Sequence, residues 1–285
     1  MTLIDGKSIS AKVKDEIKSA ASDLAAKGVE PALAVILVGE DAASKTYVAS
    51  KEKACAACGI RSVAHRLSSD VSEAALLELI ENLNEDESID GILVQLPLPK
   101  HIDTNKILEK ISPQKDVDGF SAINVGKLTS GLADGFVPCT PLGVMRLLEE
   151  YGVQLAGKNA VVLGRSNIVG KPMASLLLNA DATVTIAHSK TKNLKQLCTD
   201  ADILVAAVGR THFVSADMVK QGAVVIDVGI NRGEDGKLRG DVDFDAVAPK
   251  CSLITPVPGG VGPMTIAMLL SNTIKSAKNR LRQRV

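Results

Sequence analysis

The chain has 285 residues and a formal net charge of zero at pH 7, because 33 Lys and Arg residues balance 33 Asp and Glu residues. This balance argues against a nucleic-acid-binding protein, which would usually carry a basic excess. No apolar run approaches the roughly 18–20 residues that a membrane-spanning helix needs, and the N-terminal sequence MTLIDGKSIS lacks the regions of a signal peptide.

Five cysteines without the spacing of a disulfide framework are typical of a protein in a reducing cytosol. We therefore expect a cytoplasmic protein whose partners are neither nucleic acids nor membranes.

Short apolar runs alternate with amphipathic runs, and only 2% of the residues are aromatic, so the predicted core is aliphatic. Runs rich in β-branched residues predict strands at Ala32–Val38, Ser62–Leu67, Gly91–Leu96, Ala160–Leu163, Thr183–His188, Ile203–Val208, Val224–Val228 and Leu253–Thr255. The segments around them predict helices at Ser8–Lys27, Ser44–Cys58, Ser72–Asn84, Thr104–Ile111, Pro141–Tyr151, Gly170–Asn179, Asn193–Ala201 and Met264–Arg284. Apolar strands separated by helices are typical of parallel sheets, which predicts an α/β fold.

The segment 112–141 differs from the rest because it is rich in Gly, Asp, Pro and Ser and has no sustained period. Such a segment is typical of a functional loop at a domain boundary. The sequence therefore predicts two α/β units, the second of which begins near Pro141.

A strand–turn–helix pattern opens the second unit, with the turn Gly164-Arg165-Ser166-Asn167-Ile168-Val169-Gly170 after a predicted strand. Backbone N–H groups at such a helix N-terminus bind pyrophosphate. The spacing departs from G-x-G-x-x-G, since Ser166 holds the middle position and the last glycine comes one residue late. A strand–turn–helix without a ligand is the alternative, but the flanking strand and helix favour nucleotide binding.

The residues around this turn favour NADP over NAD. An NAD site usually has an acidic residue about twenty positions past the first glycine, where it binds the ribose 2′-OH. Here the next predicted strand ends in His188-Ser189-Lys190, and Arg165 lies in the turn itself. Hydroxyl and cationic groups suit a 2′-phosphate, and equal turnover with both cofactors would contradict this hypothesis.

Tyr47 and Lys51 stand four positions apart in a predicted helix, so they lie on one face of it. The same spacing marks short-chain dehydrogenases, but there the nucleotide-binding turn comes before the pair, whereas here Gly164 comes long after it. A solvated lysine beside a tyrosine at a helix edge is the other interpretation.

Polar residues elsewhere favour the functional interpretation. Gln95 ends a predicted buried strand, where its amide needs hydrogen-bond partners, and a lysine amine is one. Asp116 and Asp118 place carboxylates in the loop between the units. The turn 255–265 is dense in Gly and Pro, and such backbone can approach a ligand closely.

Eight motifs stand in the order found in the bifunctional methylenetetrahydrofolate dehydrogenase/methenyltetrahydrofolate cyclohydrolase family, which the chain resembles from about Asp5 to its last helix. The motifs are YVASK, DGILVQLPLP, KDVDGF, PCTP, GRSNIVGKP, DVGIN, GDVDF and TPVPGGVGPMT. The resemblance implies a catalytic folate-binding domain over residues 1–140 with the last helix, 264–285, packed back on it. It implies a Rossmann-like, doubly wound NADP-binding domain over 141–263, a cleft between the two domains, and a homodimer.

The resemblance implies that the chain oxidises 5,10-methylenetetrahydrofolate with NADP and hydrolyses the methenyl product to 10-formyltetrahydrofolate. By the same resemblance, Lys51 is the catalytic lysine, Gln95 its partner, Tyr47 the ring that stacks on the folate and Asp118 the carboxylate that holds the pterin. Its implied cofactor contacts are Gly164, Arg165, Ser166, Ser189 and Ile230, and its implied substrate-binding turn contains Pro258, Gly259, Gly262 and Pro263. To act as a base, Lys51 needs a pKa about 2–3 units below its reference value.

No metal is expected. Cys55 and Cys58 form a C-x-x-C without a second pair, and they close a predicted helix rather than open one. The aspartates at 116, 118, 241, 243 and 245 are more typical of turns. A shikimate-type dehydrogenase and a non-catalytic nucleotide sensor are the alternative functions, and NADPH production that depends on a folate distinguishes all three.

Overall fold

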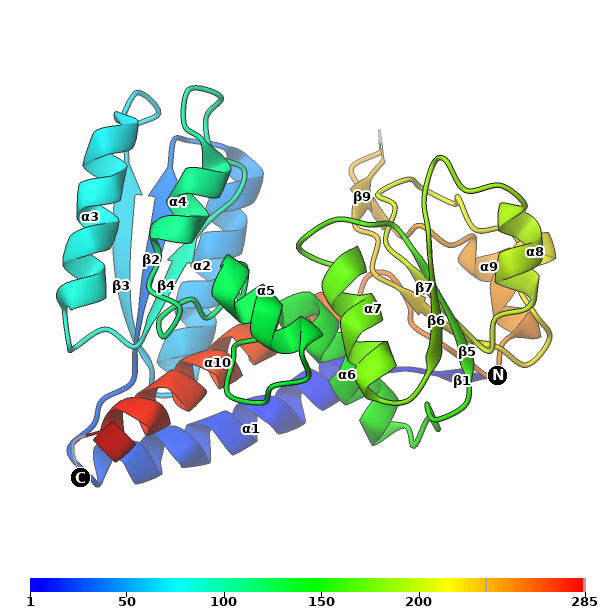
Figure 1. Cartoon of the computed structure of the whole chain (residues 1–285), viewed down its shortest axis with the longest axis horizontal. Coiled ribbons are helices and arrows are strands. Elements are labelled where there is room, and N and C mark those ends of the chain that lie inside the picture. Colours follow the sequence, from blue (N-terminus) through cyan, green and yellow to red (C-terminus); the bar gives the residue numbers. More distant parts are fainter. Residues whose placement is uncertain (234, 284–285) are drawn as a thin grey trace. The chain divides into compact units, whose positions relative to one another are not determined.

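The computed structural model describes residues 1–233 and 235–283, which group into two compact units (Figure 1). The three-stranded unit comprises Lys12–Cys139 and the chain from Ile266 onward, and the six-stranded unit comprises Met1–Ala11 and Thr140–Thr265. The division expected from the sequence differs in placing the first residues with the first unit. The fold is α/β with two units, as predicted.

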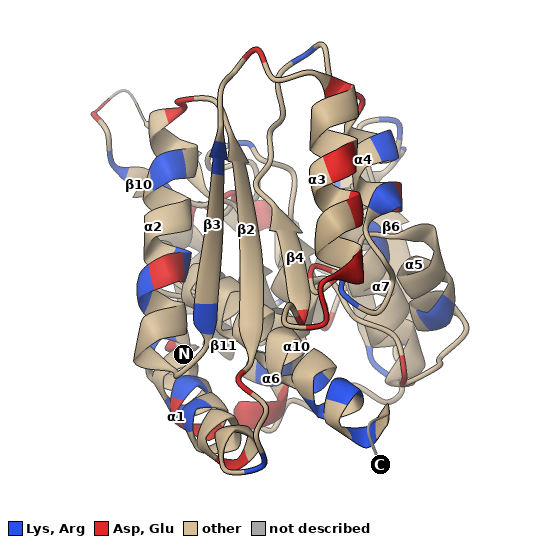
Figure 2. Cartoon of the chain, turned by 90° about the vertical axis from the view of Figure 1, so that its left-hand side faces the viewer, with Lys and Arg blue, Asp and Glu red and all other residues tan. Residues whose placement is uncertain are grey.

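The three-stranded unit contains a parallel sheet of order β3-β2-β4. Its strands are β2 (Ala32–Val38), β3 (Arg61–Leu67) and β4 (Gly91–Val94), and its helices are α2 (Ala42–Ala57), α3 (Glu73–Glu85), α4 (Thr104–Lys110) and α5 (Ala122–Thr129), with most of α1 (Gly6–Ala25) and α10 (Val261–Gln283). Every residue of β2 is buried. On α3, Leu76, Ile80 and Leu83 recur at helical spacing and are buried in one core with residues of the sheet. The acidic positions of α3 are coloured red in Figure 2, and Glu78, Glu81 and Glu85 among them are exposed.

The six-stranded unit contains a parallel sheet of order β1-β11-β8-β7-β5-β6. Its strands are β1 (Thr2–Leu3), β5 (Asn159–Leu163), β6 (Thr183–Ala187), β7 (Ile203–Ala206), β8 (Val224–Asp227) and β11 (Leu253–Ile254), and its helices include α6 (Cys139–Glu150), α7 (Gly170–Asn179), α8 (Leu194–Thr199) and α9 (Phe244–Val247). Because β6 and β7 flank β5 on opposite sides, the strand order reverses at β5. This is the Rossmann-like arrangement that the sequence predicts, and ligands bind at the carboxyl ends of the strands at such a reversal.

The structure differs from the sequence-based expectation in its short elements. The segment 112–141 is not irregular throughout, since it contains α5 and the start of α6. Ser121 caps α5 by accepting a hydrogen bond from Asn124 N, a signal that the surrounding Gly and Pro residues obscure. Strand β1 and the hairpin of β9 (Asn231–Arg232) and β10 (Leu238–Arg239) have two residues each, too few to show a period.

The last helix packs on the three-stranded unit, as predicted. The side-chain amide nitrogen of Asn272 (Nδ2) donates to Val117 O (2.8 Å) and Val137 O (3.0 Å). Further along α10, the Arg280 guanidinium donates to both carboxylate oxygens of Asp90, at 2.7 and 3.0 Å. Asp90 is only 2% exposed and also accepts from Ala32 N. The helix is therefore held by a buried, bidentate ion pair.

Arg280→Ala leaves the Asp90 carboxylate buried without its charged partner, so we expect a loss of about 3–5 kcal/mol in the free energy of unfolding. Urea denaturation followed by circular dichroism measures this loss. Arg282→Ala, two residues further on the same helix and exposed, is the matched control, with an expected change within about 0.5 kcal/mol. Equal effects of the two substitutions would contradict a role for the ion pair.

Candidate functional site

Helix α2 carries Tyr47 and Lys51 four residues apart, as predicted. The helix begins after Asp41, whose carboxylate accepts from Ser44 N at 2.8 Å. Val48 is buried, so the helix is anchored on that face. The Tyr47 side chain is 43% exposed and Lys51 is half-buried. The tyrosine ring is therefore available to a ligand, while the lysine amine points into the unit.

Lys51 Nζ donates a hydrogen bond to Gln95 Oε1 at 2.9 Å, which confirms the predicted contact between the two side chains. Gln95 directly follows β4, and its backbone N–H donates to Ile36 O of β2. Its amide nitrogen donates to Leu96 O at 2.7 Å. Because the amide NH₂ group is already engaged, the carbonyl oxygen is the side that faces the lysine.

The surroundings of Lys51 favour its neutral form. Burial lowers the pKa of Lys51, and the nearby Asp118 carboxylate acts in the opposite direction. Burial likewise raises the pKa of Asp118, which Lys51 opposes. Cys139 lies beside both groups, and burial raises the pKa of its thiol well above the usual range, so it stays protonated at neutral pH. The cluster thus combines a desolvated amine with one carboxyl group.

The loop that carries Asp118 is fixed by the neighbouring Asp116, which is 2% exposed. The Asp116 carboxylate accepts from the backbone N–H groups of Gly119, Phe120 and Ser121, at 3.0, 3.2 and 2.8 Å. Gly119 has a φ of +71°, and a Cβ there would lie 2.8 Å from backbone atoms of Val137. Only glycine fits this turn, so the position of Asp118 follows from rigid local structure.

The predicted phosphate-binding turn joins β5 to α7 at the reversal of strand order. Gly164 has a φ of +116°, and a Cβ there would lie 2.2 Å from Ala207 O. A Cβ on Gly170 would lie 2.2 Å from Gly164 O. Both glycines are therefore required by close backbone approach. The Ser166 hydroxyl accepts from Val169 N (3.2 Å) and Gly170 N (3.3 Å), so it holds the turn against the first residues of α7.

A cavity of about 510 Å³ opens at this turn and brings together four predicted cofactor contacts, Gly164, Arg165, Ser166 and Ser189. The remaining lining residues are Leu163, Ala187, His188, Thr191, Leu194, Ala207, Val208, Arg210 and Phe213. The fifth predicted contact, Ile230, is not part of this lining. It is 46% exposed and lies next to Gly262.

Sequence reasoning missed Val208, Arg210 and Phe213, although their place just after β7 was a usable signal. The Arg210 guanidinium lies over the Phe213 ring, 5.0 Å from its centroid.

The predicted substrate-binding turn leads into α10. Gly259 has a φ of +107°, and its carbonyl accepts from Lys7 N at 3.1 Å. The carbonyl of Pro263 accepts from Ser10 Oγ at 3.0 Å. Pro258 and Gly262 belong to the same turn, which lies in the six-stranded unit. The Lys51 cluster belongs to the three-stranded unit.

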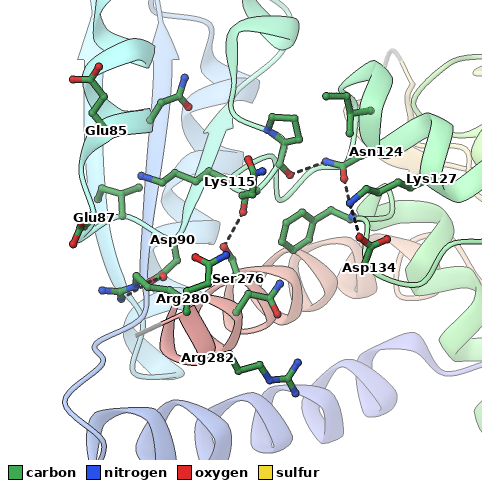
Figure 3. Close-up of a pocket in the computed structure, with 18 residues that line it drawn as sticks. Glu85, Glu87, Asp90, Lys115, Asn124, Lys127, Asp134, Ser276, Arg280 and Arg282 are labelled. Carbon is green, nitrogen blue, oxygen red and sulfur yellow. Dashed lines mark hydrogen bonds and ion pairs between the residues drawn. The ribbon is translucent and has the colours of Figure 1, made fainter. Parts of the chain in front are cut away.

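A second cavity, about 730 Å³, lies in the three-stranded unit (Figure 3), and Lys51 is not among the residues that line it. Several of its charged groups pair with one another or with the backbone. Lys127 binds Asp134 at 2.7 Å, Arg280 binds Asp90, and Lys115 Nζ donates to two carbonyl groups. We therefore assign these contacts to packing within the three-stranded unit, with Arg280 joining α10 to it.

Within residues 1–233 and 235–283, no three His, Cys, Asp or Glu side chains are grouped so that they could hold a metal ion. Over the same residues, no helix has the length and apolar character to cross a membrane. Cys55 and Cys58 are buried free thiols, and burial raises the pKa of Cys55 to about 12.

Comparison with known proteins links both units to folate chemistry. The family model for the tetrahydrofolate dehydrogenase/cyclohydrolase catalytic domain matches residues 4–118, and the model for the NAD(P)-binding domain of the same family matches residues 138–281. A bifunctional protein FolD from Campylobacter hominis is 71% identical and covers 99% of both chains.

Two solved structures share the whole fold. The crystal structure of the bifunctional enzyme FolD, methylenetetrahydrofolate dehydrogenase/cyclohydrolase, from Campylobacter jejuni is 59% identical with a TM-score of 0.97, over 98% of this chain and 99% of that one. The structure of the Trypanosoma brucei N5,N10-methylenetetrahydrofolate dehydrogenase-cyclohydrolase, complexed with NADP cofactor and inhibitor, is 42% identical with a TM-score of 0.94. The match covers 99% of this chain and 98% of that one.

The pKa of Lys51 can be measured by labelling with acetic anhydride across a range of pH, with mass spectrometry to quantify the product. We expect a midpoint below the ordinary value of 10.5, because burial disfavours the charged amine. Asp118→Asn removes the carboxylate that opposes this effect, so the midpoint should fall further. Exposed Lys53, on the same helix, is the reference amine. A midpoint at or above 10.5 would contradict the electrostatic description of the site.

Proposed function

Because the chain belongs to the tetrahydrofolate dehydrogenase/cyclohydrolase family, we propose that it oxidises 5,10-methylenetetrahydrofolate with NADP and hydrolyses the methenyl product to 10-formyltetrahydrofolate. The observation that carries the proposal is the half-buried Lys51 amine, held 2.9 Å from Gln95 Oε1. A nucleotide sensor would have no use for this contact.

The dehydrogenase step depends on orientation rather than on acid–base catalysis. Bound NADP would supply the acceptor for the hydride that leaves the methylene carbon. The residues of the six-stranded unit fit a dinucleotide, because Gly164 and Gly170 leave a backbone cradle that a Cβ would fill. Arg165 and Ser189 present a cation and a hydroxyl in the same cavity, which suits a 2′-phosphate. We assign Ile230 to the cofactor site on the family resemblance.

The cyclohydrolase step uses the Lys51 cluster. A water molecule attacks the cationic methenyl carbon, and Lys51 accepts a proton from that water, which leaves a hydroxyl group on the carbon. The bond from the carbon to N5 then breaks as the hydroxyl proton is transferred to N5, so the carbon remains on N10 as a formyl group and N5 becomes N–H. Burial lowers the pKa of Lys51, and the positive charge of the bound methenyl group lowers it further. Gln95 keeps the amine in place, because its amide carbonyl can accept a hydrogen bond from the lysine in either protonation state.

The remaining residues hold the folate. Asp118 accepts hydrogen bonds from the amino and ring N–H groups of the pterin, and the exposed Tyr47 ring stacks on the substrate. The turn with Pro258, Gly259, Gly262 and Pro263 presents backbone close to the substrate. The proposal includes a homodimer, which the family resemblance supports. It also includes a cytoplasmic location, which is consistent with five free, buried cysteines.

The test combines pure protein, 5,10-methylenetetrahydrofolate and NADP, with the absorbance of NADPH and of methenyl-folate followed together. NADPH should rise with little methenyl-folate, because both steps proceed. Lys51→Met should lower the rate at which added methenyl-folate is hydrolysed by at least about 100-fold, which is the scale of general base catalysis. Lys53→Met, an exposed neighbour, should retain both activities. Full cyclohydrolase activity in Lys51→Met would exclude the proposed base.

Cofactor preference tests the other unit. Arg165→Ala removes a cation from the cavity, and loss of a charged hydrogen bond of about 1.5–3 kcal/mol corresponds to roughly a 10- to 150-fold lower kcat/KM with NADP. The rate with NAD should change little, because NAD lacks the 2′-phosphate. Lys158→Ala, at an exposed position just before β5 and so at the end of that strand away from the turn, is the control. If the native protein turns over NAD and NADP equally, the preference itself is wrong.

A further inference from the structure

Two buried carboxylates lie in the six-stranded unit and have no part in the chemistry described above. Asp227 ends β8 and is 3% exposed, and Asp241 follows β10 and is 0% exposed. Burying a carboxylate costs free energy unless hydrogen-bond donors satisfy its oxygens. The donors around each of these two groups therefore identify the segments that it holds in position.

Asp241 gathers the segment that leaves β7. Its Oδ2 accepts from Val208 N at 2.6 Å and Gly209 N at 2.9 Å, and its Oδ1 accepts from Arg210 N at 2.9 Å. Three successive backbone N–H groups therefore converge on one carboxylate. Val208 and Arg210 both line the cofactor cavity. The carboxylate thus lies behind the wall of that cavity and determines the path of its backbone.

Asp241 also holds the segment after β8. Its Oδ1 accepts from the side-chain amide of Asn231 at 2.9 Å, and Asn231 follows Ile230, the predicted cofactor contact. A Cβ on Gly229 would lie 2.3 Å from Asp241 Oδ1. The segment after β8 therefore packs directly against the carboxylate.

Asp227 in turn fixes the position of Asp241. Its Oδ1 accepts from Gly229 N and Asp241 N, both at 2.9 Å, and its Oδ2 accepts from Val242 N at 2.9 Å. Its own backbone N–H donates to Thr255 Oγ1 at 2.7 Å. The two carboxylates form a connected network that joins the ends of β7 and β8 with the segment after β10.

We propose that Asp241 is a positioning residue for the cofactor, whose carboxylate holds the Val208–Arg210 wall of the NADP cavity and the Ile230–Asn231 segment in their binding arrangement. The inference rests on the proposed function for the identity of the ligand. Asp241 is not among the residues that line the cavity, so it acts through the backbone that it holds.

Asp241→Asn tests the charge with almost no change in volume. An amide has one acceptor oxygen, and its NH₂ group would face N–H groups that now need a partner. The Val208–Arg210 backbone should shift, and the Kd for NADP from titration calorimetry should rise at least tenfold, as expected for loss of a charge-assisted hydrogen bond. The exposed Asp245→Asn, in the same segment, should leave the Kd unchanged.

The two activities separate a positioning role from a purely structural one. Hydrolysis of added methenyl-folate by Asp241→Asn should remain near the native rate, because Lys51, Gln95 and Asp118 belong to the other unit. The KM for NADP should rise at the same time. A lower melting temperature with an unchanged Kd and KM for NADP would overturn the proposal.

Asn231→Ala covers the case in which Asp241→Asn does not fold. It removes one neutral donor and leaves the carboxylate intact, so the Kd for NADP should rise by roughly three- to tenfold. An unchanged Kd in this variant would equally overturn the proposal. If the native protein binds NADP but does not reduce it with the folate, the proposed function fails, while the calorimetric comparison still decides the role of Asp241.

Discussion

The hydrogen bond from Lys51 to Gln95 is the interaction on which the proposed chemistry of this protein depends. A lysine in water would be charged and unable to accept a proton at neutral pH. Burial lowers the pKa of Lys51, and Gln95 gives the amine a partner that carries no charge. A carboxylate in place of Gln95 would hold the amine equally well but would favour its charged form. The neutral amide therefore orients the amine while opposing the effect of desolvation less than a carboxylate would.

Both units place their functional groups by the same constraint, which is the geometry of parallel strands. All strands of a parallel sheet end at one edge, so residues that directly follow different strands come together there. Gln95 follows β4, whereas Gly164 follows β5 and Val208 comes soon after β7. The glycines at 164 and 170 then allow the backbone of the six-stranded unit to come close to itself and to a ligand. The carboxylate of Asp241 supplies what glycine cannot, since it fixes a segment that has no regular structure of its own.

The sequence predicted the long elements well, because buried strands and amphipathic helices carry strong periods. Ala32–Val38 and Gly170–Asn179 have the predicted bounds. Helix α5 was missed because it is short and lies among Gly, Pro and Asp residues, and its cap at Ser121 is a local signal that periodicity does not detect. Strand β1 was missed because its two residues are held by pairing with β11, a partner far away in the sequence.

By itself, the sequence determined the α/β class, the family, the Tyr47–Lys51 spacing and the glycine turn, because each depends on residues that are close together in the chain or on motifs in a fixed order. Only the tertiary structure decided which distant side chains meet. The contact of Lys51 with Gln95 was an expectation until the two were placed 2.9 Å apart, and the Asp241 network was not foreseen at all. Burial is the physical reason, because a carboxylate or an amine has the same letter in the sequence whether it lies in water or in the core, and its pKa and its partners follow from that difference.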